Sequence, residues 1–95
     1  MHDLTEFSAA VARLLKTRQE TVAVAESSTG GLISASLLSL SGASSYFVGG
    51  GVIYTLAARE ALLPDGSEAL KGIRSASEPY AVWLSRVMRE HLGAT

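Results

Sequence analysis

The 95-residue sequence has no cysteine, and only 18% of its residues are charged. The lack of cysteine excludes disulfide bonds, thiolate metal ligands and a cysteine nucleophile. The two histidines, His2 and His91, lie near opposite ends of the sequence, so no ligand spacing predicts a metal site. Acidic and basic residues are mixed along the chain and nearly balance, at a net charge of −1. No basic stripe therefore indicates a nucleic-acid partner.

Long hydrophobic runs are also missing. No stretch approaches the roughly 18 consecutive apolar residues of a membrane span, and the N-terminal segment is amphipathic, without a signal-peptide pattern. The sequence thus predicts a cytoplasmic protein with no membrane partner. Hydrophobic residues nevertheless make up 47% of it. We therefore expect either a very complete core or apolar surface left for missing chain or for a partner, such as the second copy of a homo-oligomer.

Hydrophobic spacing predicts four helices and two strands. The predicted helices cover residues 4–18, 32–38, 57–63 and 77–93, and the predicted strands cover residues 21–25 and 49–55. Asp3 and Glu6 are placed as a capping box for the first helix. Ser77 and Pro79 are typical of the start of the last helix, and Gly93 is typical of its end.

The order strand–helix–strand predicts a parallel α/β fold with a right-handed crossover. Two parallel strands are not a credible sheet by themselves, because parallel sheets are buried on both faces and built from more strands. We therefore expect a single domain that is only the N-terminal part of a three-layer α/β/α fold. The further strands would come from a longer chain or from a second copy.

Residues 25–31 (AESSTGG) predict a tight, hydroxyl-rich turn between the first strand and a helix that begins on glycine. A helix N-terminus carries unpaired N–H groups and roughly half a positive charge, which favours a phosphate or a developing oxyanion. The same turn could hold a serine nucleophile. It is not a phosphate-binding P-loop, because no Gly-Lys-Ser/Thr sequence follows it.

Two features near this turn each allow two interpretations. Glu26 could act as a base for Ser27 or orient a ligand, or it could accept backbone N–H groups and brace the turn. Bracing is favoured, because adjacent side chains at a strand end point in opposite directions. The three glycines at residues 49–51 indicate either a bulge or close backbone packing, or a surface that faces a ligand.

Four short motifs, at residues 25–32, 42–44, 50–54 and 77–79, together resemble the C-terminal domain of the competence/damage-inducible protein family CinA. Residues 25–32 (AESSTGGL) resemble the family signature AES(C/S)TGGL, in which many members have cysteine at the position of Ser28. Residues 42–44 match a G-S-S turn, residues 50–54 are similar to the segment that ends in the family tyrosine, and residues 77–79 match an S-E-P helix start. The resemblance implies a domain that continues past residue 95 with further strands.

The resemblance also implies an activity. Stand-alone members look like nicotinamide-nucleotide amidohydrolases, which convert nicotinamide mononucleotide to nicotinate mononucleotide and ammonia and need no cofactor. A serine nucleophile, a lysine base and a nearby tyrosine would correspond by position to Ser27, Arg59 and Tyr54. The substrate-binding positions would be Glu26, Ser28, Thr29, Gly30, Gly31 and Ser44.

Arg59 is the main departure from the family pattern. A serine hydroxyl needs a base that can accept a proton near pH 7, and a guanidinium cannot because it does not give up its own proton there. The other lysines, Lys16 and Lys71, do not fall at the matching position, and Leu56 and Ala57 replace a polar pair of the family.

Three functions therefore follow from the sequence. The first is an amidohydrolase acting on a nicotinamide nucleotide. The second is a binding module for a nucleotide or another phosphorylated metabolite, in which Arg59 would hold the phosphate as a bidentate clamp. The third is an inactive structural fragment.

Overall fold

A computed structural model describes residues 4–95. The elements in chain order are α1 (Leu4–Arg18), β1 (Val22–Glu26), α2 (Leu32–Leu38), the 3-10 helix η1 (Ala43–Ser45), β2 (Phe47–Val52), α3 (Leu56–Leu62) and α4 (Glu78–Leu92). The predicted helices and strands are thus confirmed as elements. The proposed capping role of Asp3 lies outside the described residues.

The two strands differ from the prediction at their ends. The first begins one residue later, and the second covers residues 47–52 instead of 49–55. The second strand ends early because Thr55 caps α3, its side chain accepting a hydrogen bond from the N–H of Ala58 at 3.1 Å. The cap turns the backbone away from the sheet before the predicted end of the strand.

β1 and β2 pair in parallel, as the element order predicts. Val22 is paired with Phe47 and Ala23 with Gly49, so the register shifts by one residue at Val48. The pairing continues past β2, where the N–H of Ile53 donates to the carbonyl of Glu26 at 2.7 Å. The carboxyl ends of both strands therefore meet at one edge of the sheet.

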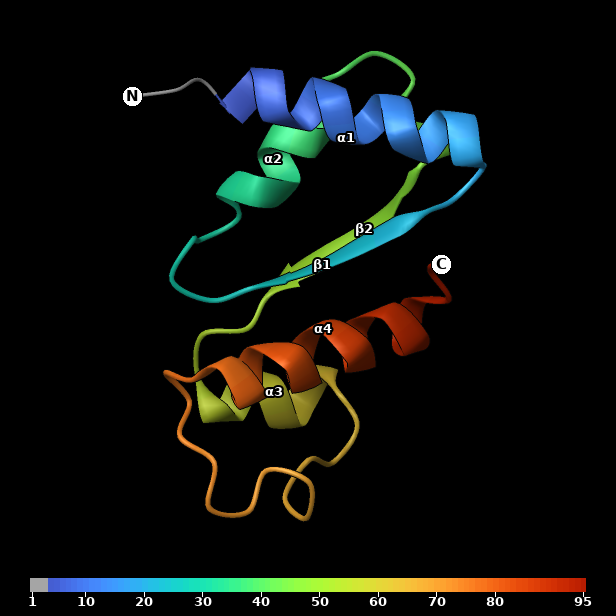
Figure 1. The fold of residues 1–95 in the computed structure, drawn as a ribbon. Helices are drawn as coiled ribbons and strands as arrows, with labels where there is room; N and C mark the ends of the chain where they lie inside the picture. The colour runs from blue at the N-terminus through green and yellow to red at the C-terminus, as the bar shows by residue number, and fades with distance from the viewer. Residues whose placement is uncertain (1–3) are drawn as a thin grey trace.

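The sheet is the middle of three layers, which confirms the predicted α/β/α arrangement (Figure 1). α1 and α2 cover one face, over a core of Ala12, Leu37, Ala43 and Tyr46. α4 and α3 lie on the other face, over a core of Ile53, Leu63, Leu84 and Met88. β1 serves both cores because alternate side chains point to opposite faces. Within residues 4–95 the sheet has two strands.

The glycine run in β2 allows close packing, which confirms that interpretation of residues 49–51. A Cβ on Gly50 would lie 2.9 Å from the carbonyl oxygen of Val24 and 2.9 Å from the hydroxyl of Ser34. Gly49 and Gly51 face α4 instead, where added Cβ atoms would come within 3.3 Å of a methyl group of Leu92 or Met88. Helices can thus approach β2 on both faces.

Both ends of α4 match the sequence signals. The hydroxyl of Ser77 accepts from the N–H of Tyr80 at 3.4 Å, and Gly93 ends the helix with φ 71°. Across residues 4–95, none of the helices combines the length and hydrophobicity that crossing a membrane would require.

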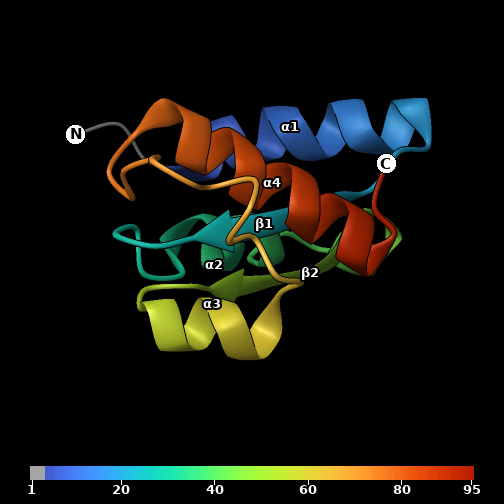
Figure 2. The ribbon, with the colours of Figure 1, turned by 90° about the horizontal axis from the view of Figure 1, so that it is seen from below.

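One side of α1 leaves apolar surface exposed, as the composition allowed. The exposed stripe consists of Leu4, Phe7, Val11 and Leu14. It borders an apolar cavity of about 320 Å³ between α1, β1 and α2. Figure 2 shows α1 on the side of β1 that faces away from β2, where this part of the chain supplies no further strand.

Candidate functional site

The turn after β1 is held by its own hydrogen bonds. Gly30 and Gly31 have φ values of 63° and 98°, a left-handed conformation that glycine adopts without steric cost. The N–H of Gly30 donates to the carbonyl of Ser27, and the N–H of Leu32 donates to the carbonyl of Thr29, both at 3.1 Å. The signature residues thus build a tight connection into α2.

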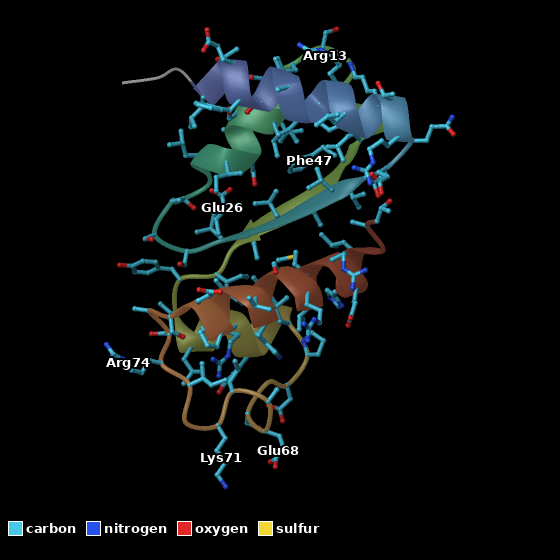
Figure 3. All side chains as sticks on the ribbon, in the orientation of Figure 1. Arg13, Glu26, Phe47, Glu68, Lys71 and Arg74 are labelled. Carbon is cyan, nitrogen blue, oxygen red and sulfur yellow. The ribbon has the colours of Figure 1, made fainter. Side chains whose placement is uncertain are left out.

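The Glu26 carboxylate binds the N–H groups at the start of α2. Its two oxygens accept from the N–H groups of Ile33 and Ser34, both at 2.9 Å, and one also accepts from the Ser34 hydroxyl at 2.7 Å. The side chain is 2% exposed and lies between β1 and α2 (Figure 3). This is the bracing arrangement. It confirms the favoured interpretation of Glu26, and it makes the N–H groups of Ile33 and Ser34 unavailable to a phosphate, because the carboxylate uses these donors of the first turn.

The environment of Glu26 lowers its pKa. Burial by itself raises the pKa of the carboxylate, but hydrogen bonds from the side chain and N–H of Ser34, the N–H of Ile33 and the Thr29 side chain outweigh it. The pKa falls from 4.5 to about 2. Glu26 is therefore a carboxylate at neutral pH and a poor proton acceptor.

A cavity of about 440 Å³ is lined by residues that follow the two strands and by residues at the start of α4. We call it the hydroxyl cavity. Its lining residues are Ser27, Ser28, Ile53, Tyr54, Ser75, Ala76 and Tyr80. Ser27, Ser28 and Tyr54 were predicted site residues, and the structure brings them together. Tyr54 is 76% exposed.

Ser75, Ala76 and Tyr80 were missed by the sequence reasoning. A signal was present in the S-E-P motif at residues 77–79, which starts α4 beside the signature turn. The carboxyl ends of parallel strands are also where open α/β sheets bind ligands. Neighbours of the motif could therefore have been assigned to the site.

Arg59 does not line the hydroxyl cavity. Its guanidinium lies over the ring of Tyr80 at 5.8 Å and over the ring of Trp83 at 6.0 Å, measured to the ring centroids. It also adds to the lowering of the pKa of Asp65, which comes first from hydrogen bonds of Ser67. Arg59 belongs to the packing of α3 against α4.

The remaining predicted residues lie outside the cavity lining. Thr29, Gly30 and Gly31 form the turn beside it. Ser44 is not brought together with them, because η1 precedes β2 and so lies at the opposite end of the strands. The two lysines are also outside the lining. Lys16 donates to the carbonyl of Ser41 at 3.2 Å, and Lys71 lies in the outer loop (Figure 3).

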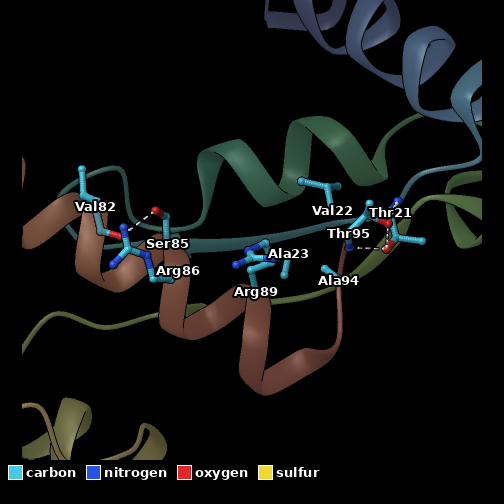
Figure 4. A pocket seen from close by; sticks show the side chains of 9 residues that line it. All are labelled: Thr21, Val22, Ala23, Val82, Ser85, Arg86, Arg89, Ala94 and Thr95. Atoms are coloured by element: carbon cyan, nitrogen blue, oxygen red, sulfur yellow. Dashed lines mark hydrogen bonds between the residues drawn. The ribbon is translucent and has the colours of Figure 1, made fainter.

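A second cavity, of about 390 Å³, lies between the start of β1 and α4 (Figure 4). Arg86 and Arg89 line it together with Thr21 and Thr95, whose side chains and N–H groups hydrogen-bond to one another. None of the predicted site residues lines this cavity. In the part of the chain that the structure describes, no three His, Asp or Glu side chains are grouped as metal ligands would be.

Comparison with known proteins identifies relatives of both sequence and fold. The family profile described as "CinA C-terminal domain" matches residues 4–95. A CinA-like protein from Salinibacter ruber is 40% identical over 81 residues, and one from Picosynechococcus is 48% identical over 68 residues. The first match covers 85% of this chain and 20% of the relative, and the second covers 72% and 16%.

Solved structures agree with this assignment. The competence damage-inducible protein A from Klebsiella pneumoniae superposes with a TM-score of 0.87 at 28% identity, over 98% of this chain and 58% of the other. The competence/damage-inducible protein from Agrobacterium tumefaciens gives a TM-score of 0.86 at 28% identity, over 99% and 57%. The chain thus spans little more than half of these structures and about a fifth of the curated relatives. Family profile, sequence identity and fold agree: the chain belongs to the CinA C-terminal domain family.

Proposed function

We propose that this chain is a ligand-binding module built on the CinA C-terminal fold, which holds a small polar molecule such as a nicotinamide nucleotide without hydrolysing it. The observation behind the proposal is the composition of the hydroxyl cavity. Five hydroxyl groups line it, and none has a hydrogen-bond partner among residues 4–95. The lining carries no group that accepts a proton readily near pH 7.

The chemistry of the lining favours the neutral part of a nucleotide. Hydroxyl groups both donate and accept hydrogen bonds, so they suit a carboxamide or the hydroxyls of a ribose. The rings of Tyr54 and Tyr80 supply apolar surface for a planar heterocycle. A volume of about 440 Å³ is within the range of small-molecule sites.

Neither Glu26 nor Arg59 is placed to act as the base that hydrolysis by Ser27 would need. A serine nucleophile needs a neighbour that takes its proton. The Glu26 carboxylate is buried, is committed to α2 and has a pKa of about 2. The Arg59 guanidinium lies over two rings and is not part of the cavity lining. The amidohydrolase activity implied by the family resemblance therefore remains the alternative function.

The test compares Ser27→Ala with Ser44→Ala, two serine variants at opposite ends of the sheet. Nicotinamide mononucleotide is titrated into each protein by calorimetry, and ammonia is measured after prolonged incubation. We expect binding without ammonia from the natural chain. Ser27→Ala should weaken binding about two- to tenfold through a lost hydrogen bond, while Ser44→Ala should leave it unchanged.

Two outcomes would contradict the proposal in different directions. Ammonia from the natural chain and from Ser44→Ala, but not from Ser27→Ala, would establish the hydrolase. Neither binding nor ammonia would leave the structural fragment as the remaining function.

A further inference from the structure

We infer that Arg59 is a positioning residue, which holds the Tyr80 ring in place as a wall of the hydroxyl cavity and does not bind the charged group of a ligand. The ligand-binding consequence rests on the function proposed above, whereas the positioning of the ring does not. The inference replaces the phosphate-clamp role that the sequence allowed for Arg59.

The contact with two rings at once is the first observation. Tyr80 and Trp83 are three residues apart on α4, so they lie on the same side of the helix, about one turn from each other. The Arg59 guanidinium reaches both ring faces from α3, at 5.8 Å and 6.0 Å from the centroids. A planar cation is attracted to such faces and stacks on them.

The second observation is that the aromatic pair is backed from behind. A Cβ on Gly66 would overlap the Trp83 ring and would come within 3.1 Å of a methyl group of Leu70. The backbone at Gly66 thus closes one side of Trp83, and Arg59 lies over the ring face. Tyr80 and Trp83 both pack against the core of α4. Trp83 is thus bordered by the Gly66 backbone and by Arg59, and Tyr80 is bordered by Arg59.

The third observation is that Tyr80 alone of this group reaches the cavity. Tyr80 lines the hydroxyl cavity, whereas Arg59 and Trp83 do not. Tyr54, the other ring of the lining, is 76% exposed and has little support of its own. A fixed Tyr80 is consequently the ordered wall against which a planar ligand can lie. Loss of Arg59 should weaken binding whatever the charge of the ligand.

A pair of probes separates this role from a direct clamp. Nicotinamide mononucleotide and nicotinamide riboside differ by one phosphate group, and both are titrated into Arg59→Met and into Arg13→Met. Arg13 is exposed on α1 and points away from the cavity (Figure 3), so it is the matched control. We expect Arg59→Met to weaken both probes by the same factor, about two- to fivefold, with no change in the control. Loss of affinity for the phosphorylated probe alone would overturn the inference.

A measurement without ligand tests the positioning of the rings independently of the proposed function. Trp83 is the single tryptophan of the chain, so its emission and its quenching by acrylamide report on this contact alone. Arg59→Met should increase quenching, and Arg59→Lys should give an intermediate value, because an ammonium keeps the charge but does not stack as a plane. If neither probe binds the natural chain, the proposed function fails. Unchanged Trp83 quenching in both variants would then overturn the inference as well.

Folding of the variants is checked by circular dichroism. Should Arg59→Met fail to fold, Arg59→Lys is compared with the natural chain by the same two measurements. Weaker binding of both probes with increased Trp83 quenching supports the positioning role. An unchanged Arg59→Lys contradicts it, since only the planar stacking has been removed.

Discussion

The Glu26 carboxylate occupies the position at the start of α2 where an external anion would otherwise meet free N–H groups. A negative charge at this end of a helix is stabilised both by those donors and by the helix dipole. The bracing role was predictable from the sequence, because side chains alternate along a strand and Glu26 therefore points away from Ser27. The burial of Glu26 was not predictable in this way, because it results from the packing of α2 over β1. At the scale of single residues, a helix start that resembles an anion-binding site is thus occupied by a carboxylate of the same chain.

Stability should fall in acid because of Glu26. Its folded-state pKa of about 2 lies below the ordinary value of 4.5. A lowered pKa means that the stabilisation is fully present above pH 4.5 and is lost as the pH falls from 4.5 toward 2. The contribution is on the order of 3 kcal/mol. Urea unfolding measured across this pH range should show the decline.

Glu26→Gln tests the same group at neutral pH. The amide cannot accept hydrogen bonds with both ends, so one N–H group of α2 loses its partner, and we expect a loss of about 2–3 kcal/mol. The variant should also show a flatter dependence of stability on pH below 4.5. Glu60→Gln, on the exposed side of α3, is the control and should stay within about 0.5 kcal/mol. Equal behaviour of the two variants would show that Glu26 does not brace α2.

At the scale of elements, the packing of β2 against its neighbours explains why glycine recurs at residues 49–51. Each glycine faces a different neighbour, and the neighbours belong to β1, α2 and α4. The cost in backbone entropy of a glycine-rich strand is offset by the approach of helices on both faces. The ends of the strand are set by local events instead, namely the register shift at Val48 and the Thr55 cap.

Gly50→Ala should destabilise the chain more than Gly49→Ala. The new methyl group on residue 50 would meet the backbone oxygen of Val24, which cannot move without disturbing the sheet, and we expect a loss of about 1–3 kcal/mol. On residue 49 it would meet the flexible end of Leu92, so the change should stay within about 1 kcal/mol. Thermal unfolding of both variants gives the comparison. The reverse order of stabilities would refute the close approach of β1 to Gly50.

At the scale of the whole molecule, residues 4–95 bury two small cores and leave much apolar surface on α1. The stripe on α1 is exposed although its residues have core spacing, because the sheet beneath has two strands in the described range. The helix is acidic in its first turn and basic in its last. A second copy lying antiparallel on this stripe would therefore meet opposite charges as well as apolar side chains. The homo-oligomer expected from the sequence remains a prediction.

Sedimentation velocity over a series of concentrations tests association through α1. We expect the natural chain to sediment faster as the concentration rises. Leu14→Lys places a charge in the stripe, where Leu14 is 60% exposed, and should shift association to about tenfold higher concentration. Thr17→Lys adds the same charge to an exposed position outside the stripe and should have little effect. A natural chain that stays monomeric at every concentration would refute the prediction.

Most of the fold could be predicted from residues that are close in sequence, but only part of the candidate site could be predicted. Helix caps, turn glycines and hydrophobic spacing involve residues within a few positions of each other, so Ser77 and Gly93 marked the ends of α4 correctly. Ser27 and Tyr54 were paired through the family resemblance, and the structure brings them to one cavity because the parallel strands end at one edge. Ser75 was missed because the loop before α4 has no periodic pattern, and Tyr80 was missed because the S-E-P motif marks the start of α4 without showing that this start lies beside the signature turn.

The sequence by itself determined the order of the elements, the parallel pairing and, through its motifs, the family. These follow from local hydrogen bonding, from periodicity and from the handedness and length of connections. Only the tertiary structure decided that the Glu26 carboxylate occupies N–H groups at the start of α2 and that the Arg59 guanidinium lies over the rings of Tyr80 and Trp83. The physical reason is that the direction of a side chain depends on elements packed against it from distant parts of the chain.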